Sequence, residues 1–181
     1  MLPTIHTLSA DELEAELAAF VHLLEDAVDH GASLGFFAPL DLDAVRAYWL
    51  SLRGDLRRGT RLLLAARAAD GCIVGTGQLV LPPLPSSRHR VELQKLIVDF
   101  RMRGGGIGAR LMDALHAAAL ARDRSLIVLG TRSGERPEAF YRRLGYRVAG
   151  AIPGYTTDGT GRRYVHTTLY LDLHAPVEHS C

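Results

Sequence analysis

The chain has 181 residues, of which 48% are hydrophobic and 23% charged, and its formal net charge is +1. This composition is typical of a folded globular protein, and the absence of a strong basic excess argues against nucleic acid as a partner. No apolar run approaches the ~20 residues that a membrane-spanning helix needs, so we expect no membrane partner. Two cysteines form no disulfide framework, and we expect a cytoplasmic protein without a metal site.

The first half of the chain is predicted to combine helices with a β-hairpin. Ser9 and Glu12 form a capping box, which marks the start of an amphipathic helix. The dipeptide Asp70-Gly71 is a typical tight turn between two strands. In chain order we expect a strand over residues 4–8, a helix from about residue 10, a loop over 29–40, a helix over 41–58, and strands over 61–69 and 72–81.

The second half of the chain alternates predicted strands with helices. We expect a loop over 82–87, a strand from residue 91, a helix over 107–122, a strand over 126–129, a helix over 137–144, and strands over 147–152 and 164–173. This pattern predicts an α/β fold with a mixed sheet. We expect a single domain over residues 1–173, followed by a flexible tail over 174–181.

The most informative segment is a glycine-rich turn, residues 103–108, between the strand from Val91 and the helix from Ile107. Its sequence is Arg103-Gly-Gly-Gly-Ile-Gly108. Such a turn presents unpaired backbone N–H groups and the positive end of a helix dipole, and this combination binds anions. Glycine also lets a phosphate approach the backbone closely. The segment therefore predicts a pyrophosphate-binding site.

Three classes of nucleotide ligand use such turns. A P-loop is excluded because Lys95 is the only lysine in the chain and no Lys-Ser or Lys-Thr pair exists. The run from Gly104 to Ala109 matches the dinucleotide fingerprint, but the next strand ends in Gly130 instead of the acid that would bind a ribose. Coenzyme A is the third class.

Two motifs resemble the GNAT family of N-acetyltransferases. The glycine turn fits that family's R-x-x-G-x-G/A sequence, and Phe140-Tyr141 followed by Gly145-Tyr146 resembles its second signature. One helix and one strand separate the two, as in the family. The resemblance implies a GNAT fold, namely a mixed, mostly antiparallel sheet of six to seven strands flanked by about four helices. It also implies acetyl-CoA as co-substrate.

Further segments resemble a subgroup of small bacterial acetyltransferases that includes the tabtoxin-resistance protein. Glu92-Leu-Gln-Lys-Leu96 is similar to its E-[LV]-Q-K-[LV] strand, and the aromatic loop before Leu40 is similar to its substrate-side loop. One departure concerns the strand at 126–129, which the subgroup follows with L-D-T. Here the sequence is Leu129-Gly130-Thr131, so a carboxylate is missing, and Glu135 is one side chain that could replace it.

The resemblance implies a set of site residues. Tyr141 is the expected general acid beside the sulfur of CoA, and packing at a helix end is the alternative explanation for it. The expected CoA-binding residues are Leu96, Ile97, Val98, Arg103, Gly104, Gly105, Gly106, Ile107, Gly108, Thr131 and Tyr141.

On the acceptor side, Glu92 is the expected general base, acting directly or through water. By strand alternation it shares a face with Gln94, Leu96 and Val98. A salt bridge to Lys95 or Arg90 is the alternative role for its carboxylate. The expected substrate-binding residues are Phe36, Phe37, Glu92 and Tyr155.

These residues predict an N-acetyltransferase that transfers acetyl from acetyl-CoA to the primary amine of a small molecule, such as an amino-acid-like toxin or antibiotic. Direct attack in a ternary complex is the expected mechanism, and a homodimer is possible. Two alternatives stay open: an acetyltransferase of protein N-termini or lysines, and an acyl-CoA-binding module without turnover. The apolar bulk of the loop at Phe36 and Phe37 favours a small ligand.

Overall fold

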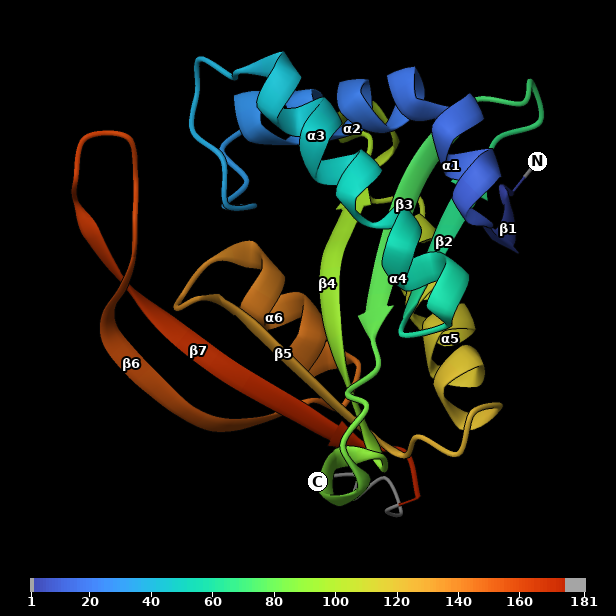
Figure 1. The fold of residues 1–181 in the computed structure, drawn as a ribbon. Helices are drawn as coiled ribbons and strands as arrows, with labels where there is room; N and C mark the ends of the chain where they lie inside the picture. The colour runs from blue at the N-terminus through green and yellow to red at the C-terminus, as the bar shows by residue number, and fades with distance from the viewer. Residues whose placement is uncertain (1, 175–181) are drawn as a thin grey trace.

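The computed structural model describes residues 2–174, so residues 175–181 of the predicted tail lie outside the described part (Figure 1). One seven-stranded sheet runs through the molecule in the order β1-β2-β3-β4-β5-β7-β6. Every neighbouring pair is antiparallel except β4 and β5, which confirms the mixed, mostly antiparallel sheet. The strands are β1 (Thr4–Thr7), β2 (Arg61–Arg67), β3 (Ile73–Val80), β4 (Arg90–Val98), β5 (Leu126–Arg132), β6 (Arg147–Thr157) and β7 (Arg163–Asp172).

Helices cover both faces of this sheet (Figure 1). The capping box is confirmed: the Ser9 hydroxyl accepts from Glu12 N at 3.2 Å, and the Glu12 carboxylate accepts from Ser9 N at 2.7 Å. Both predicted N-terminal helices are interrupted by one residue, at Glu16 and at Leu52, so that each forms two shorter helices. The helices are α1 (Ala10–Ala15), α2 (Leu17–Asp29), α3 (Leu42–Ser51), α4 (Arg53–Arg58), α5 (Ile107–Leu120) and α6 (Arg136–Arg143).

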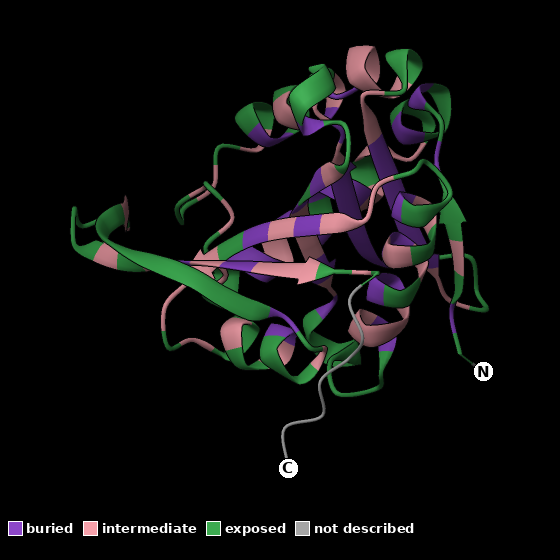
Figure 2. Ribbon diagram, turned by 90° about the horizontal axis from the view of Figure 1, so that it is seen from below, coloured by how far each residue is buried: buried purple, intermediate pink, exposed green. Residues whose placement is uncertain are grey.

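The core has two layers, one on each face of the sheet. Strands β2 and β3 are almost wholly buried between them (Figure 2). On one face, Leu111 and Leu115 of α5 pack against the sheet, and on the other Phe20 and Trp49 form the centre of the α1–α4 layer. Helix α5 approaches β3 closely because Gly77 has no side chain: a Cβ there would lie 2.7 Å from Leu115 Cδ1. Among residues 2–174, no helix is long and apolar enough to cross a membrane.

Strands β4 and β5 diverge after a short parallel contact. They pair only at Arg90 with Leu126, Val91 with Ile127, and Glu92 with Val128. Beyond these pairs the two strands separate in a V, and α6 lies beside β5 (Figure 1). The second half of β4 therefore turns main-chain groups toward a side where no strand pairs with it. Exposed backbone groups of this kind are available to a ligand.

A β-bulge at Lys95 changes which residues of β4 share a face. Lys95 adopts φ 49°, and the pairing of β3 with β4 shifts by one residue between Thr76 and Gln78. An extra residue in one strand reverses the alternation beyond it. Consequently Leu96 and Val98 pack on the α5 side, so the prediction that they share a face with Glu92 is wrong.

The hairpin of β6 and β7 is longer than predicted. Strand β6 extends to Thr157 instead of ending at Ile152, with a register shift between Ile152 and Thr156. It passes through Pro153, which a sheet edge tolerates because the missing N–H would face solvent. The hairpin projects from the body of the molecule, and β6 is exposed along its length (Figure 2).

Candidate active site

The glycine turn lies between the end of β4 and the start of α5, as the sequence predicts. Gly104 and Gly106 adopt φ 84° and 80°, which L side chains rarely adopt, and a Cβ on either would meet nothing within 4 Å. Gly106 is the N-cap of the 14-residue helix α5, and no side chain caps it. The first-turn N–H groups are therefore unpaired and point at open space, as an anion-binding site requires.

Two residues of the turn have structural tasks that the sequence did not reveal. The Arg103 N–H donates to Phe100 O at 3.3 Å, so this backbone group is not free for a ligand. The Arg103 side chain donates from Nε to Val98 O at 3.1 Å and lies over the Phe100 ring. Gly108 faces Phe140, whose ring would lie 3.4 Å from a Cβ there. The available N–H groups thus begin at Gly104.

Most of the other predicted CoA-binding residues belong to the elements on either side of this turn, whereas Thr131 lines the cavity described below. Ile97 is buried against the α1–α4 layer, whereas Ile107, the first residue of α5, is buried on the other face of the sheet, so both can offer only backbone atoms. Leu96 and Val98 are partly buried on the α5 side. Thr131 lies in the second half of β5, beyond the last pair with β4.

Tyr141 lies on α6, the helix beside β5. Only 8% of its surface is exposed, and its ring packs against Phe140 and Tyr146 at centroid distances of 5.3 and 5.7 Å. Burial raises the pKa of the Tyr141 phenol well above its usual value. The phenol is therefore protonated at every physiological pH and can donate a hydrogen bond to a developing thiolate.

Glu92 is exposed near the start of β4. Its carboxylate accepts a hydrogen bond from the Gln94 amide at 2.9 Å. Within residues 2–174 it forms no salt bridge with Lys95 or Arg90, so that alternative role is not found. It is not among the residues that line the cavity described next.

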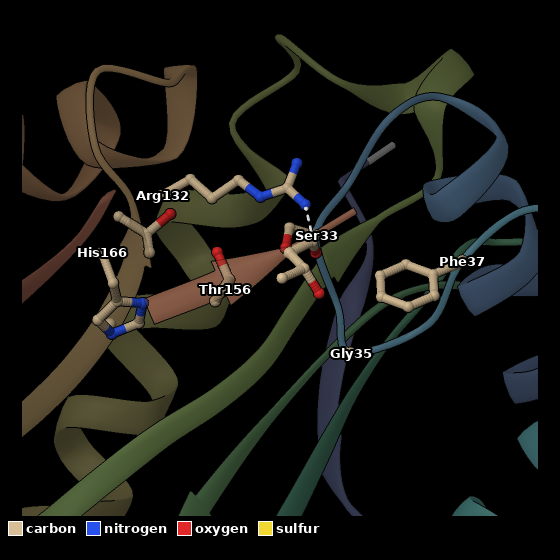
Figure 3. A pocket seen from close by; sticks show the side chains of 9 residues that line it. Ser33, Gly35, Phe37, Arg132, Thr156 and His166 are labelled. Carbon is tan, nitrogen blue, oxygen red and sulfur yellow. Dashed lines mark hydrogen bonds between the residues drawn. The ribbon is translucent and has the colours of Figure 1, made fainter. Parts of the chain in front are cut away.

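A cavity of about 250 Å³ lies where three distant segments meet (Figure 3). The α2–α3 loop, the end of β5 and the β6–β7 hairpin form its walls. Its lining comes from Ser33, Gly35 and Phe37 of the loop, residues 130–132 of β5, and Thr156, Thr157 and His166 of the hairpin. The volume is below the ~300–1,000 Å³ of pockets for drug-sized ligands, so the cavity suits a molecule of amino-acid size.

Among the predicted substrate-binding residues, Phe37 lines this cavity, whereas Phe36 packs edge-on against Tyr48 and supports the loop. Tyr155 is 59% exposed and lies against the His166 ring, with the centroids 4.3 Å apart. Glu135 lies 3.7 Å from Arg132 and is not among the cavity's lining residues.

The tip of the hairpin is cross-linked by its own hydrogen bonds and contacts the loop at one point. Asp158 accepts hydrogen bonds from Thr160 N, Thr160 Oγ1, Arg162 N and the Tyr164 hydroxyl at 2.6 to 3.1 Å. These bonds, chiefly that from the Thr160 hydroxyl, hold the pKa of its carboxyl well below the usual range. Gly159 packs on Phe37: a Cβ on Gly159 would lie 3.5 Å from Phe37 Cβ. Loop and hairpin tip therefore close one side of the cavity.

Two cations stand at or beside the cavity. The Arg132 side chain is 12% exposed, and its Cζ atom lies 4.1 Å from the centre of the Tyr164 ring. Its guanidinium donates to Thr157 O at 3.3 Å (Figure 3). Lys95 is the residue at the bulge, and its amine lies 5.1 Å from the centre of the Tyr48 ring. A Cβ on Gly35 would be 3.9 Å from it. Burial lowers the pKa of Lys95, helped by Arg61, and no anion within residues 2–174 offsets its charge.

The sequence analysis did not place Arg132, Lys95 or His166 at or beside this cavity. Arg132 and His166 pair across β5 and β7, and their shared position depends on a register that the sequence does not specify. One feature of the sequence pointed to His166: residue 130 is glycine where the similar subgroup has aspartate, and the His166 ring fills the space beside it. In the part of the chain that the structure describes, no group of three or more His, Cys, Asp or Glu side chains is placed to hold a metal ion.

A glycine turn at the start of a helix, next to a parallel pair of strands that diverges, is the arrangement that the resemblance to acyl-CoA-dependent acetyltransferases implied. The family model for the acetyltransferase (GNAT) domain matches residues 58–148. The chain therefore belongs to the GNAT family of acetyltransferases, which confirms the resemblance on which the fold prediction depended.

Known relatives agree with this family. The chain is 29% identical to the L-methionine sulfoximine/L-methionine sulfone acetyltransferase of Pseudomonas aeruginosa over 140 residues, covering 77% of this chain and 79% of the relative. The ribosomal-protein-alanine N-acetyltransferase of Brucella melitensis is 26% identical, with a TM-score of 0.74 over 94% of this chain and 99% of the other. The protein yncA of Salmonella typhimurium, whose structure was solved with acetyl-CoA as its cofactor, has the same fold at 21% identity, with a TM-score of 0.74 over 99% of this chain and 100% of the other.

Proposed function

We propose that this protein transfers the acetyl group of acetyl-CoA to the primary amine of a small, amino-acid-like molecule by direct attack in a ternary complex. The observation that carries the proposal is the position of the 250 Å³ cavity, at the open end of β5 and beyond the point where β4 and β5 part. A donor held by the glycine turn and an acceptor in this cavity would meet between the two strands. The Pseudomonas relative, by its name, acetylates molecules of the amino-acid class.

Acetyl-CoA, when bound, supplies the acetyl group as an activated thioester. The backbone N–H groups from Gly104 to Gly108 would hold its pyrophosphate, and the unpaired edge of β4 would hold its pantetheine arm. An N–H of that edge would also polarise the acetyl carbonyl. These residues fit the group because the turn is open and the strand edge has no partner.

Tyr141 is the proposed hydrogen-bond donor to the departing sulfur. The pKa of a phenol already lies above that of an ordinary thiol, ~8.5, and burial raises the pKa of Tyr141 further. A full proton transfer from Tyr141 to a free thiolate would therefore be uphill. A hydrogen bond that strengthens as negative charge develops on sulfur needs no such transfer. The phenol therefore stabilises the leaving group while remaining protonated in the resting enzyme.

The positive charge around the cavity supports an acceptor that carries a carboxylate. Lys95 is largely buried without an anionic partner, which is unfavourable unless a ligand supplies the counter-ion. Arg132 adds a planar guanidinium in the cavity wall. Free amino acids and their analogues combine a carboxylate with a primary amine in a molecule of this size.

A second candidate is acetylation of a protein N-terminus, favoured by the name of the Brucella relative. The closed contact between Gly159 and Phe37 argues against it because a peptide needs an open groove. The third alternative, a binding module without turnover, predicts acetyl-CoA binding but no release of CoA.

The test is release of free CoA thiol from acetyl-CoA with a panel of acceptors. The panel holds L-methionine sulfone, its decarboxylated amine, other amino acids, polyamines, aminoglycosides and an alanine-initiated peptide. We expect turnover with an amino acid and much less with its decarboxylated partner. Turnover only with the peptide would support the second candidate, and acetyl-CoA binding without any release would support the binding module.

We also propose a cytoplasmic location and a homodimer. Supporting the dimer is the exposed edge strand β6, which carries Val148, Ile152 and Tyr155 on its surface. Sedimentation equilibrium of the purified protein tests it, and a monomer at micromolar concentration would contradict it. No nucleic-acid or membrane partner is proposed.

A further inference from the structure

The ring of His166 occupies the space in which residue 130 would carry a side chain. A Cβ built on Gly130 would lie 2.0 Å from His166 Nε2 and 2.3 Å from Cε1, which no real Cβ tolerates. His166 comes from β7 and pairs with Arg132, so its ring leans diagonally toward Gly130, two residues before Arg132 on β5. The position of the His166 ring therefore depends on glycine at 130, because a side chain on residue 130 would displace the ring.

The cavity contains few groups that can take up a proton. Of its lining residues, only Arg132 and His166 are ionisable, and no carboxylate is among them. Arginine stays protonated in proteins, whereas a neutral imidazole has one nitrogen with a free lone pair. Acetylation of an amine needs an acceptor for the ammonium proton, since only the free amine is nucleophilic. His166 is the lining side chain that meets this need.

The surroundings of His166 keep its ring neutral. Burial lowers the pKa of the imidazole, and neither a hydrogen bond nor an ion pair from the described residues opposes this shift. Arg132 lies opposite His166 across β5 and β7, and the Tyr155 ring of β6 lies 4.3 Å away between ring centroids. The nearest acidic groups have other partners: Glu135 lies 3.7 Å from Arg132 Nη1, and Asp158 accepts from Thr160 and Tyr164. Among the described residues no carboxylate forms an ion pair with His166, so none stabilises an imidazolium.

We propose that His166 is the catalytic base of the acceptor site and that Gly130 is the residue that makes room for it. The inference rests on the proposed function. The amine enters as an ammonium, and one proton passes to the free imidazole nitrogen. The amine then forms the new N–C bond as the C–S bond of the thioester breaks. The second amine proton is balanced by the proton that the thiolate takes up. His166 returns its proton to water, so one proton is released per turnover.

The test compares pH profiles of the full chain and its His166→Gln variant with the best acceptor from the panel. Glutamine keeps the size and polarity of the side chain but cannot act as a base. We expect kcat/KM to fall on the order of 100-fold at pH 7, the usual contribution of a general base. The loss should shrink as pH rises, because more amine then arrives unprotonated. The Kd for acetyl-CoA, measured by calorimetry, should be unchanged.

A second variant tests the steric relation between residues 130 and 166 directly. In Gly130→Asp/His166→Ala the ring is gone and a carboxylate occupies the vacated space, so a proton acceptor returns from the opposite strand. We expect at least a tenfold gain in kcat over His166→Ala alone. As a control, His22→Gln replaces an exposed histidine of α2 and should leave the rate and the pH profile unchanged.

The outcomes separate this inference from the proposed function. If His166→Gln keeps the parent's rate and pH profile while the parent turns over an amino acid, the role of His166 is overturned and the proposed function stands. If the parent binds acetyl-CoA but acetylates no acceptor in the panel, the proposed function fails, and the role of His166 fails with it.

Discussion

The proposed donor site and the proposed acceptor site of this protein are built in opposite ways. The donor site is one continuous stretch, from the bulge at Lys95 through the glycine turn to the start of α5, and it presents backbone atoms. The acceptor site is assembled from three segments that lie up to 133 positions apart, from Ser33 to His166, and it presents side chains. Backbone recognition suits a constant ligand such as CoA, whereas side chains on separate loops can change with the acceptor.

This contrast predicts that Gly106→Val has the largest effect. Valine at φ 80° is strained, and its branched side chain would fill the space that a phosphate needs. We expect acetyl-CoA affinity to fall at least on the order of 100-fold by calorimetry, with the loss of several backbone hydrogen bonds to a charged group. Gly59→Val is the matched control, because Gly59 has φ 69° and open space but caps α4 far from the turn. Equal loss of affinity in both variants would mean that strain alone is responsible.

Tyr141→Phe is expected to rank next. Turnover should fall about 10–100-fold while acetyl-CoA affinity is kept, because the phenyl ring still fills the buried site and only the hydroxyl is lost. Tyr146→Phe is the control: it removes a hydrogen bond to His116 at 3.0 Å, at a cost of about 1 kcal/mol in unfolding free energy. The assignment of Tyr141 fails if both variants retain the parent's kcat.

Glu92→Gln decides between the two candidate bases. If His166 is the base, Glu92 only attracts the cationic amine, and we expect a few-fold rise in KM with an unchanged pH profile, as for an exposed charge in water. If Glu92 is the base, as the sequence predicted, turnover drops strongly and recovers at higher pH. Measuring both variants across the same pH series discriminates the two residues.

Lys95→Met is expected to give the smallest and most selective effect. Methionine keeps the apolar stem of the side chain but removes the ammonium group. KM should therefore rise about tenfold for an acceptor with a carboxylate, in line with one lost charged hydrogen bond. For the decarboxylated amine, KM should stay constant. Thermal stability should be equal or higher, because a buried charge without a partner is removed. Arg46→Met, on the exposed face of α3, is the control cation. A similar KM change for both acceptors would contradict the role in carboxylate binding.

Local signals in the sequence were sufficient to predict the glycine turn and the elements beside it. The capping box at Ser9 and the glycines of the turn act within a few residues, so their geometry follows from neighbouring atoms. The second signature around Tyr141 adds a buried phenol on a short helix, which the structure places beside β5. For the same reason the boundaries of most strands were predicted closely, whereas the edge strand β6 ran five residues further than its apolar pattern indicated.

The amino-acid sequence by itself determined the family, the glycine turn and the order of helices and strands. Only the tertiary structure decided which side chains line the cavity proposed for the acceptor. The bulge at Lys95 reverses the faces of β4, and the register of β5 with β7 places His166 over Gly130. Both depend on hydrogen-bond pairing between strands distant in sequence. A shift of one residue in that pairing moves a side chain to the opposite face of the sheet, which is why the sequence pattern could not assign it.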